Sequence, residues 1–281
     1  MFLSRLALAA LLALGQPAAA QTVSGETTEV SVDRLAEVLQ LAALFDVLRE
    51  EGIAHGDSLQ ADMFPSGGGA NWKNEVDRIY DAERLLAGFT RALDAELADQ
   101  PEALAAIEEF FASDLGRRVI GLEIEARRAF LDTAAEEAAR VAAEDAAAAK
   151  DPKVALVRRM IEAGDLVEMN VAGGLSGSLA FMTGMADSGA YGTMPLDQIL
   201  SDVWAQEEQI RADTTSWLGA YLGLAYTPLS EAEFQTYVEF WESTAGKRLN
   251  AALFTAFDQV FRQVSLELGR AAGRAVQGSD I

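Results

Sequence analysis

The sequence predicts an all-α protein, a multi-helix bundle of two tandemly repeated helical units after a cleaved signal peptide. Apolar residues recur at helical spacing from Val32 onward, and no alternating strand pattern competes with them. An eleven-residue motif also occurs twice, at 109–119 and again at 239–249. Five of the eleven positions are identical between the two copies, which is the basis for predicting a repeat.

The repeated motif predicts a helix, a tight corner and a second helix. An aromatic pair ends the first helix, a serine caps the second, and a glycine three positions later lets the two helices approach closely. The predicted motif residues are Phe110, Phe111, Ser113, Gly116, Arg118, Phe240, Trp241, Ser243, Gly246 and Arg248. An alternative is that serine, glycine and arginine line an anion pocket at a helix N-terminus. The helix dipole disfavours basic side chains there, which hints at a role beyond folding.

Composition sets limits on the class of protein. The chain has 281 residues, of which 50% are apolar, so it can bury a sizeable core. The formal charge of −22 repels nucleic acid and anionic lipid headgroups, so we expect no nucleic-acid partner. The absence of cysteine excludes disulfides, thiolate metal sites and cysteine nucleophiles.

The first twenty residues have the form of a secretory signal peptide. A basic start at residues 1–5 precedes an apolar run at residues 6–14, and small residues then offer a cleavage site after about Ala20. The apolar run is too short for a spanning helix, and no cysteine follows for a lipid anchor. We therefore expect an exported, periplasmic protein whose residues 21–31 form a flexible lead-in.

The first helical repeat is expected over 32–150. Its helix from Val32, or that helix's continuation, should end at Gly52, and residues 53–70 should be mostly loop. Pro101 suits the first turn of a helix that carries the first motif. The further helices expected here are 74–98 and a long connector helix from Gly116 to about Ala149.

The second helical repeat is expected over 151–281, beginning at Asp151-Pro152. One long helix is expected over 196–224, broken by Pro228. Ser230 and Glu233 then form a capping box, with Leu229 and Phe234 at the flanking apolar positions. A final helix should follow Gly246 with one apolar stripe.

The motif and the helix start before it carry a family resemblance. Leu229-Ser230-Glu231 with Glu233-Phe234, followed by the aromatic, Ser, Gly and basic positions of 239–249, resembles the exported bacterial family catalogued as domain of unknown function two-zero-five-nine, here in two tandem copies. The resemblance is best over 228–268 and weaker over 101–130, and Asp114 and Thr244 replace the proline frequent in that family. It implies a small exported helical protein and supplies no catalytic residue.

Catalytic, cofactor and metal sites are not predicted. The only histidine, His55, is expected in a polar loop away from any nucleophile motif. No histidine–carboxylate spacing suits zinc or a di-iron centre, and no calcium-binding loop occurs. Neighbouring carboxylates such as Glu207 and Glu208 point about 100° apart on a helix, so they indicate solvated faces. The triple glycine at 67–69 lacks the lysine of a phosphate loop.

The uncharged stretch 170–186 keeps a binding hypothesis open. It is expected to be a buried helix or a glycine-rich loop, with contact to a lipid or ligand as the alternative. The four tryptophans are expected in the core, or one could wall a pocket between the halves. We therefore expect an exported, non-enzymatic protein that binds an unknown envelope protein or an apolar ligand. The alternatives are a hydrolase with an unfamiliar acidic site acting on envelope material, and a protein attached to the membrane surface through 170–186.

Overall fold

The computed structural model describes residues 31–65, 69–190 and 195–279, and the predicted signal peptide and most of the lead-in lie outside these ranges. The described residues form α-helices and no strand, so the predicted all-α class is confirmed. The helices are α1 Val32–Val38, α2 Leu41–Met63, α3 Gly69–Ile79, α4 Ala82–Leu97, α5 Pro101–Ala112, α6 Asp114–Ala129, α7 Thr133–Ala149, α8 Pro152–Ala163, α9 Leu166–Asp187, α10 Leu196–Trp204, α11 Glu207–Tyr226, α12 Glu231–Glu242 and α13 Thr244–Ser279.

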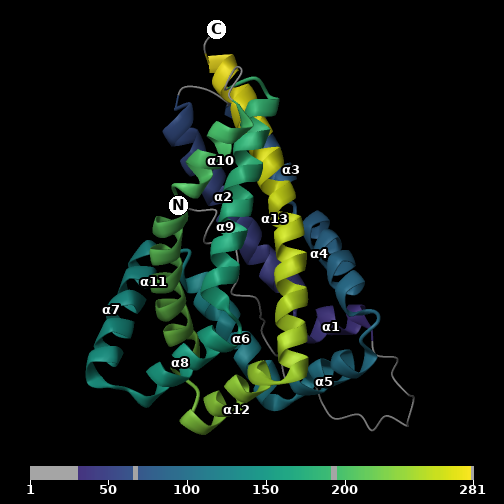
Figure 1. The fold of residues 1–281 in the computed structure, drawn as a ribbon, viewed down its shortest axis with the longest axis vertical. Coiled ribbons are helices and arrows are strands. Elements are labelled where there is room, and N and C mark those ends of the chain that lie inside the picture. Colours follow the sequence, from purple (N-terminus) through teal and green to yellow (C-terminus); the bar gives the residue numbers. More distant parts are fainter. Residues whose placement is uncertain (1–30, 66–68, 191–194, 280–281) are drawn as a thin grey trace.

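Helix α13 is the element around which the others pack. It is 36 residues long and contacts α9, α4, α12, α3, α5 and α2. Figure 1 shows it rising from its corner with α12, between α9 on one side and α4 on the other. Its Phe257 meets Phe89 of α4 at a centroid distance of 4.5 Å, and Phe89 meets Phe45 of α2 at 5.3 Å. Residues from both predicted repeats therefore share one continuous core.

The predicted loop over 53–70 is wrong, because α2 continues to Met63. Its two glycines are sites of close packing rather than helix ends. A Cβ at Gly52 would strike the ring of Tyr80, and one at Gly56 would strike Val76. The carbonyl of Gly56 also accepts a hydrogen bond from the Trp72 indole at 3.0 Å.

Three helices expected to be continuous are divided in two. The 74–98 helix breaks at Asp81, whose carboxylate accepts from the amide of Arg84 at 2.8 Å and so begins α4. The long connector from Gly116 breaks at Asp132, which accepts from the amide of Ala134 at 2.8 Å and begins α7. The helix over 196–224 is α10 and α11, divided after Trp204. In the first two, an aspartate cap interrupts a helical period that the surrounding residues would otherwise continue.

Helix α9 is the glycine- and serine-rich stretch, and close backbone packing explains why it is stable as a helix. A Cβ at Gly184 would strike the carbonyl of Leu266 on α13, and one at Gly269 would strike the carbonyl of Phe181 on α9. These two glycines let the helices approach almost backbone to backbone. Although 170–186 is uncharged, none of the helices in the described ranges is long and apolar enough to cross a membrane.

Candidate functional site

The two predicted corners have the same local geometry. Ser113 and Ser243 have backbone angles within a degree of each other, φ −71 and ψ 165 against φ −70 and ψ 164. Their hydroxyls accept from the amides of Gly116 at 3.0 Å and Gly246 at 3.1 Å. A Cβ on either glycine would strike the carbonyl oxygen of Phe110 or Phe240 at the end of the preceding helix. The glycine is therefore required by the tightness of the turn.

The corners also pack against each other through their aromatic residues. The rings of Phe110 and Phe240 stack at 4.1 Å with an interplanar angle of 16°. Phe111 meets Phe240 edge to face at 5.1 Å. Trp241 lies half-buried beside Tyr237 at a centroid distance of 6.0 Å. All the predicted aromatic residues of the motif therefore lie in or beside one cluster between the corners.

The basic motif residues do not gather into an anion pocket. Arg118 donates to the carboxylate of Glu233 and, at 2.7 Å, to the carbonyl of Pro228, so it fastens α6 to the start of α12. Glu233 is also the acid of the predicted capping box, which is present with Ser230. Arg248 is exposed, and no carboxylate of the described residues lies within 4.0 Å of it. The contacts favour the structural role of the motif.

Sequence reasoning missed a buried carboxyl group on α6, the helix that begins at the first corner. Glu123 of α6 is 3% exposed, and its Oε1 accepts from the hydroxyls of Tyr226 at 2.5 Å and Tyr237 at 2.7 Å. A third buried tyrosine, Tyr221, donates to the backbone carbonyl of Glu123 at 2.8 Å. The available signal was the position of Glu123 on the same helical face as Val119, which is fully buried.

Burial dominates the electrostatics of this cluster. It raises the pKa of Glu123 to about 8, against the lowering effect of the hydrogen bonds from Tyr226 and Tyr237. Burial also raises the pKa of all three tyrosines. Around neutral pH, Glu123 is therefore mainly a neutral acid.

A buried charged group lies one turn further along α6. Arg127 is 2% exposed, and it donates from Nε to Oε1 of Glu51 at 2.7 Å and from Nη2 to Oε2 at 2.8 Å. This two-point pairing joins α6 to α2. His55, further along α2, is buried in the helix rather than placed in the predicted loop, and burial lowers its pKa to about 4.

The cavity beside Glu123 is a small one. Its volume is about 40 Å³, and Glu123 is the one acidic residue among its lining residues. That space holds about one water molecule. Within the ranges that the structure describes, no three or more His, Asp or Glu side chains gather as metal ligands. Glu123 therefore has no second carboxyl group beside it in this cavity.

Three surface grooves lie beside the outward face of α9. Their volumes are about 580, 690 and 420 Å³, and Ser176 lines all three. Two of them lie along α13, and the third lies toward α10 and α11. Their sizes are those of sites for small ligands or peptide side chains.

The groove of about 420 Å³ carries the strongest apolar character. The α9 residues Val171, Leu175 and Leu179 line one side of it, and Leu200 and Trp204 line the other. Trp204 was expected in the core, yet it is 61% exposed. Together with Leu196, which is 64% exposed, Leu200 and Trp204 form a row at i, i+4 and i+8 on α10. We call this row and groove the α10 face.

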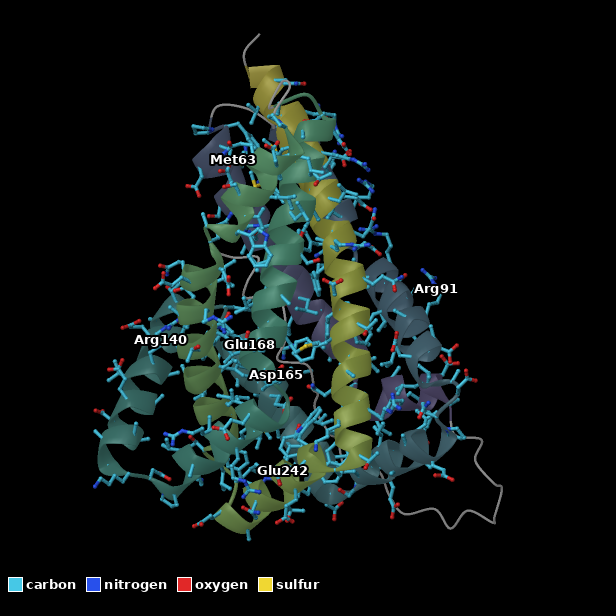
Figure 2. The ribbon with its side chains drawn as sticks, viewed as in Figure 1. Met63, Arg91, Arg140, Asp165, Glu168 and Glu242 are labelled. Atoms are coloured by element: carbon cyan, nitrogen blue, oxygen red, sulfur yellow. The ribbon has the colours of Figure 1, made fainter. Side chains whose placement is uncertain are left out.

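Charged residues stand at the edge of the α10 face. Glu168, Glu207 and Arg211 line the groove, and Arg211 donates to both glutamates, with 2.9 Å to Oε2 of Glu168 and 3.1 Å to Glu207. Figure 2 shows Glu168 near the middle of the molecule, in the region of α9 and α11. Because two acids share one base, and Asp197 and Asp202 lie on α10 itself, the edge is acidic.

Comparisons with known proteins identify no similar protein. No protein-family model, no curated protein and no solved structure matches this chain. The resemblance to the family of unknown function therefore stays a prediction.

Proposed function

We propose that this chain is an exported, non-catalytic binding protein of the cell envelope, and that the α10 face holds an apolar partner segment flanked by basic residues. The observation that carries the proposal is the exposed row of Leu196, Leu200 and Trp204 over an apolar groove. Exposed large apolar side chains gathered in one place mark interaction sites, whereas scattered ones do not.

Charge favours a basic protein segment over an anionic membrane surface. The chain has 44 acidic and 22 basic residues, so it repels anionic headgroups at long range. The acidic edge of the α10 face attracts lysine or arginine next to an apolar stripe. An amphipathic helix with those properties fits a groove between helices, since its apolar residues recur at i, i+3 and i+4.

The test uses a designed probe in place of the unidentified partner. A fluorescent sixteen-residue Leu/Lys peptide, with leucine on one helical face, is titrated into the mature chain by anisotropy. We expect the L200S/W204S variant to bind about tenfold or more weakly, because truncating an interfacial tryptophan commonly costs at least about 2 kcal/mol.

The control variant replaces two other exposed apolar residues that lie elsewhere. Val141 and Leu224 are 50% and 37% exposed and do not line the groove, so V141S/L224S should bind like the unaltered chain. Equal losses in both variants would overturn the proposal. Equal binding of a Leu/Glu peptide would contradict the charge argument.

A further inference from the structure

A second groove differs in chemistry from the α10 face. It has a volume of about 580 Å³, its floor is α13, and its walls are α4 and α9. We call it the α13 trough. Its lining side chains include three arginines, Arg84, Arg91 and Arg262, and no aspartate or glutamate. The chain as a whole has twice as many acidic as basic residues, whereas the charged residues that line this groove are all basic.

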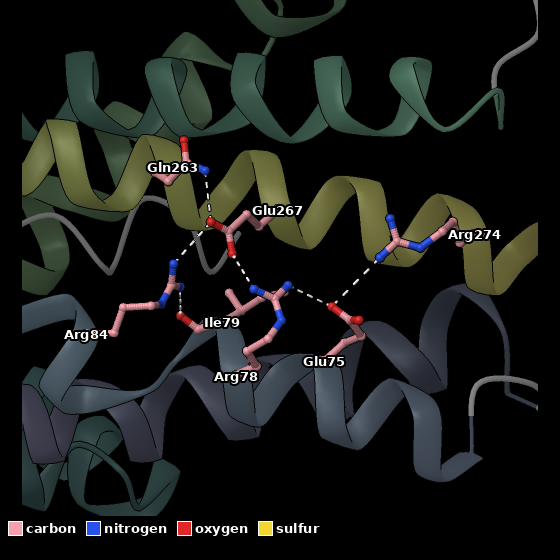
Figure 3. Close-up of polar contacts among 7 residues, drawn as sticks. All are labelled: Glu75, Arg78, Ile79, Arg84, Gln263, Glu267 and Arg274. Atoms are coloured by element: carbon pink, nitrogen blue, oxygen red, sulfur yellow. Dashed lines mark hydrogen bonds and ion pairs between the residues drawn. The ribbon is translucent and has the colours of Figure 1, made fainter. Parts of the chain in front are cut away.

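One end of the trough is held rigid by an ion-pair network, shown in Figure 3. Glu267 of α13 accepts from Arg84 at 3.1 Å and from Gln263 at 2.8 Å, and Arg84 also donates to the carbonyl of Ile79 at 2.5 Å. Arg84 and Gln263, which both line the trough, are therefore fixed in place.

The network itself carries an excess of positive charge. Arg78 donates to Glu267 at 3.3 Å and to Glu75 at 2.8 Å, and Arg274 lies 3.8 Å from Glu75. With Arg84, three arginines share two glutamates. Burial pushes the pKa of Glu267 upward, but the Gln263 hydrogen bond and the charges of Arg84 and Arg78 outweigh it, so the pKa lies below its ordinary value. The carboxylate of Glu267 is therefore ionised and already paired with these side chains.

The other two arginines of the trough are available to a ligand. Arg91 and Arg262 are exposed, and no carboxylate of the described residues lies within 4.0 Å of either. Asp258 stands one turn before Arg262 on α13, lines the neighbouring groove, and makes no ion pair with it. Figure 2 shows Arg91 on the outer side of α4, and its exposed side chain lines the trough.

Apolar side chains line the trough as well as the charged groups. Leu85 of α4, Leu179 and Ala180 of α9, and Val260 and Leu266 of α13 line the trough. A ligand that suits both the arginines and the apolar side chains has an oxyanion at one end and a hydrocarbon chain attached to it. Guanidinium groups bind carboxylate and phosphate through paired hydrogen bonds, and the hydrocarbon chain gains from burial.

We propose that the α13 trough binds an organic oxyanion, a carboxylate or phosphate on an alkyl chain, with Arg91 and Arg262 holding the oxyanion. This site is separate from the α10 face and does not depend on the function proposed for it. Gln259 of α13 also lines the trough, and its side-chain amide can donate an additional hydrogen bond.

Calorimetric titration of the mature chain tests the proposal with four probes, each below its micelle-forming concentration. They are dodecyl phosphate, dodecanoate, dodecyltrimethylammonium and inorganic phosphate. We expect the two anionic amphiphiles to bind and the cationic one, which has the same chain, to fail. Binding of inorganic phosphate that depends on the two arginines would identify a free anion as the ligand source, and its absence would identify an amphiphile.

Two variants with the same change in net charge separate the site from general electrostatics. R91Q/R262Q should weaken binding of dodecyl phosphate about tenfold or more, because two charged hydrogen-bond donors are lost. R128Q/R158Q removes two other exposed arginines that make no ion pair within the described ranges and should bind like the unaltered chain. Added salt should weaken binding in the unaltered chain. Equal losses in both variants, equal binding of the cationic probe, or binding of no probe would overturn the proposal.

Discussion

At the scale of the residue, the group with the clearest consequence is Glu123. Its carboxyl is buried among three tyrosines, and burial raises its pKa to about 8. In the unfolded chain the same carboxyl has an ordinary pKa near 4.5. Between these values the folded state keeps a proton that the unfolded state releases, so rising pH favours unfolding.

We predict that the E123Q variant lacks this pH dependence. The stability that protonated Glu123 contributes is fully present below about pH 4.5 and is lost as the pH rises toward 8. The free energy of unfolding of the unaltered chain should fall relative to that of E123Q by about 1.4 kcal/mol per pH unit within this window. Urea unfolding at pH 5, 6, 7 and 8 measures the difference. E125Q, an exposed neighbour on α6, is the control, and parallel curves for E123Q and the unaltered chain would disprove the assignment.

The corner glycines give a second prediction at this scale. A Cβ at Gly116 or Gly246 would strike a backbone carbonyl oxygen of the preceding helix, so the backbone itself must shift. We expect G116A and G246A each to lower the free energy of unfolding by about 1–3 kcal/mol. At Gly219, inside α11, a Cβ would meet nothing within 4 Å, so G219A should instead raise stability by about 0.5–1 kcal/mol. Chemical denaturation checks all three, and a neutral G116A would show that the corner is looser than described.

At the scale of the element, the buried pair of Arg127 and Glu51 links α6 to α2. Replacing Arg127 by methionine removes the guanidinium that neutralises a carboxylate only 14% exposed. We expect R127M to lose about 3–5 kcal/mol and the double variant E51M/R127M to lose less, because no unneutralised carboxylate remains. The exposed pair of Arg49 and Asp77 is the comparison, and R49Q should cost at most about 1 kcal/mol. Thermal unfolding measures these losses of stability, and a double variant less stable than R127M would refute this interpretation.

Helix starts that depend on capping residues close together in the sequence were predictable. The capping box at Ser230 and the caps at Ser113 and Ser243 depend on residues three positions apart, and the structure has all of them. The breaks at Asp81 and Asp132 were missed, because a single aspartate interrupts an otherwise unbroken helical period. Gly52 was misinterpreted as a helix end, since its real partner, Tyr80, is distant in the sequence.

At the scale of the whole molecule, the candidate sites were only partly predictable. The uncharged stretch 170–186 was singled out from composition, and its outward face does border the three grooves. Trp204 was expected in the core, because periodicity shows that a residue is apolar and does not show whether another helix covers it. The α13 trough brings together Arg91, Ser176 and Arg262 from three helices, a combination that no local pattern in the sequence encodes.

The central claim is that the α10 face is a binding surface, and acrylamide quenching of tryptophan fluorescence tests it most directly. Trp204 is 61% exposed, whereas Trp72 and Trp217 are 2% and 7% exposed, so Trp204 should account for much of the quenching in the free chain. Saturating Leu/Lys peptide, which contains no tryptophan, should lower the quenching constant of the unaltered chain and leave that of W204F unchanged. Quenching that stays constant at saturation, or that falls equally in W204F, would contradict binding at this face.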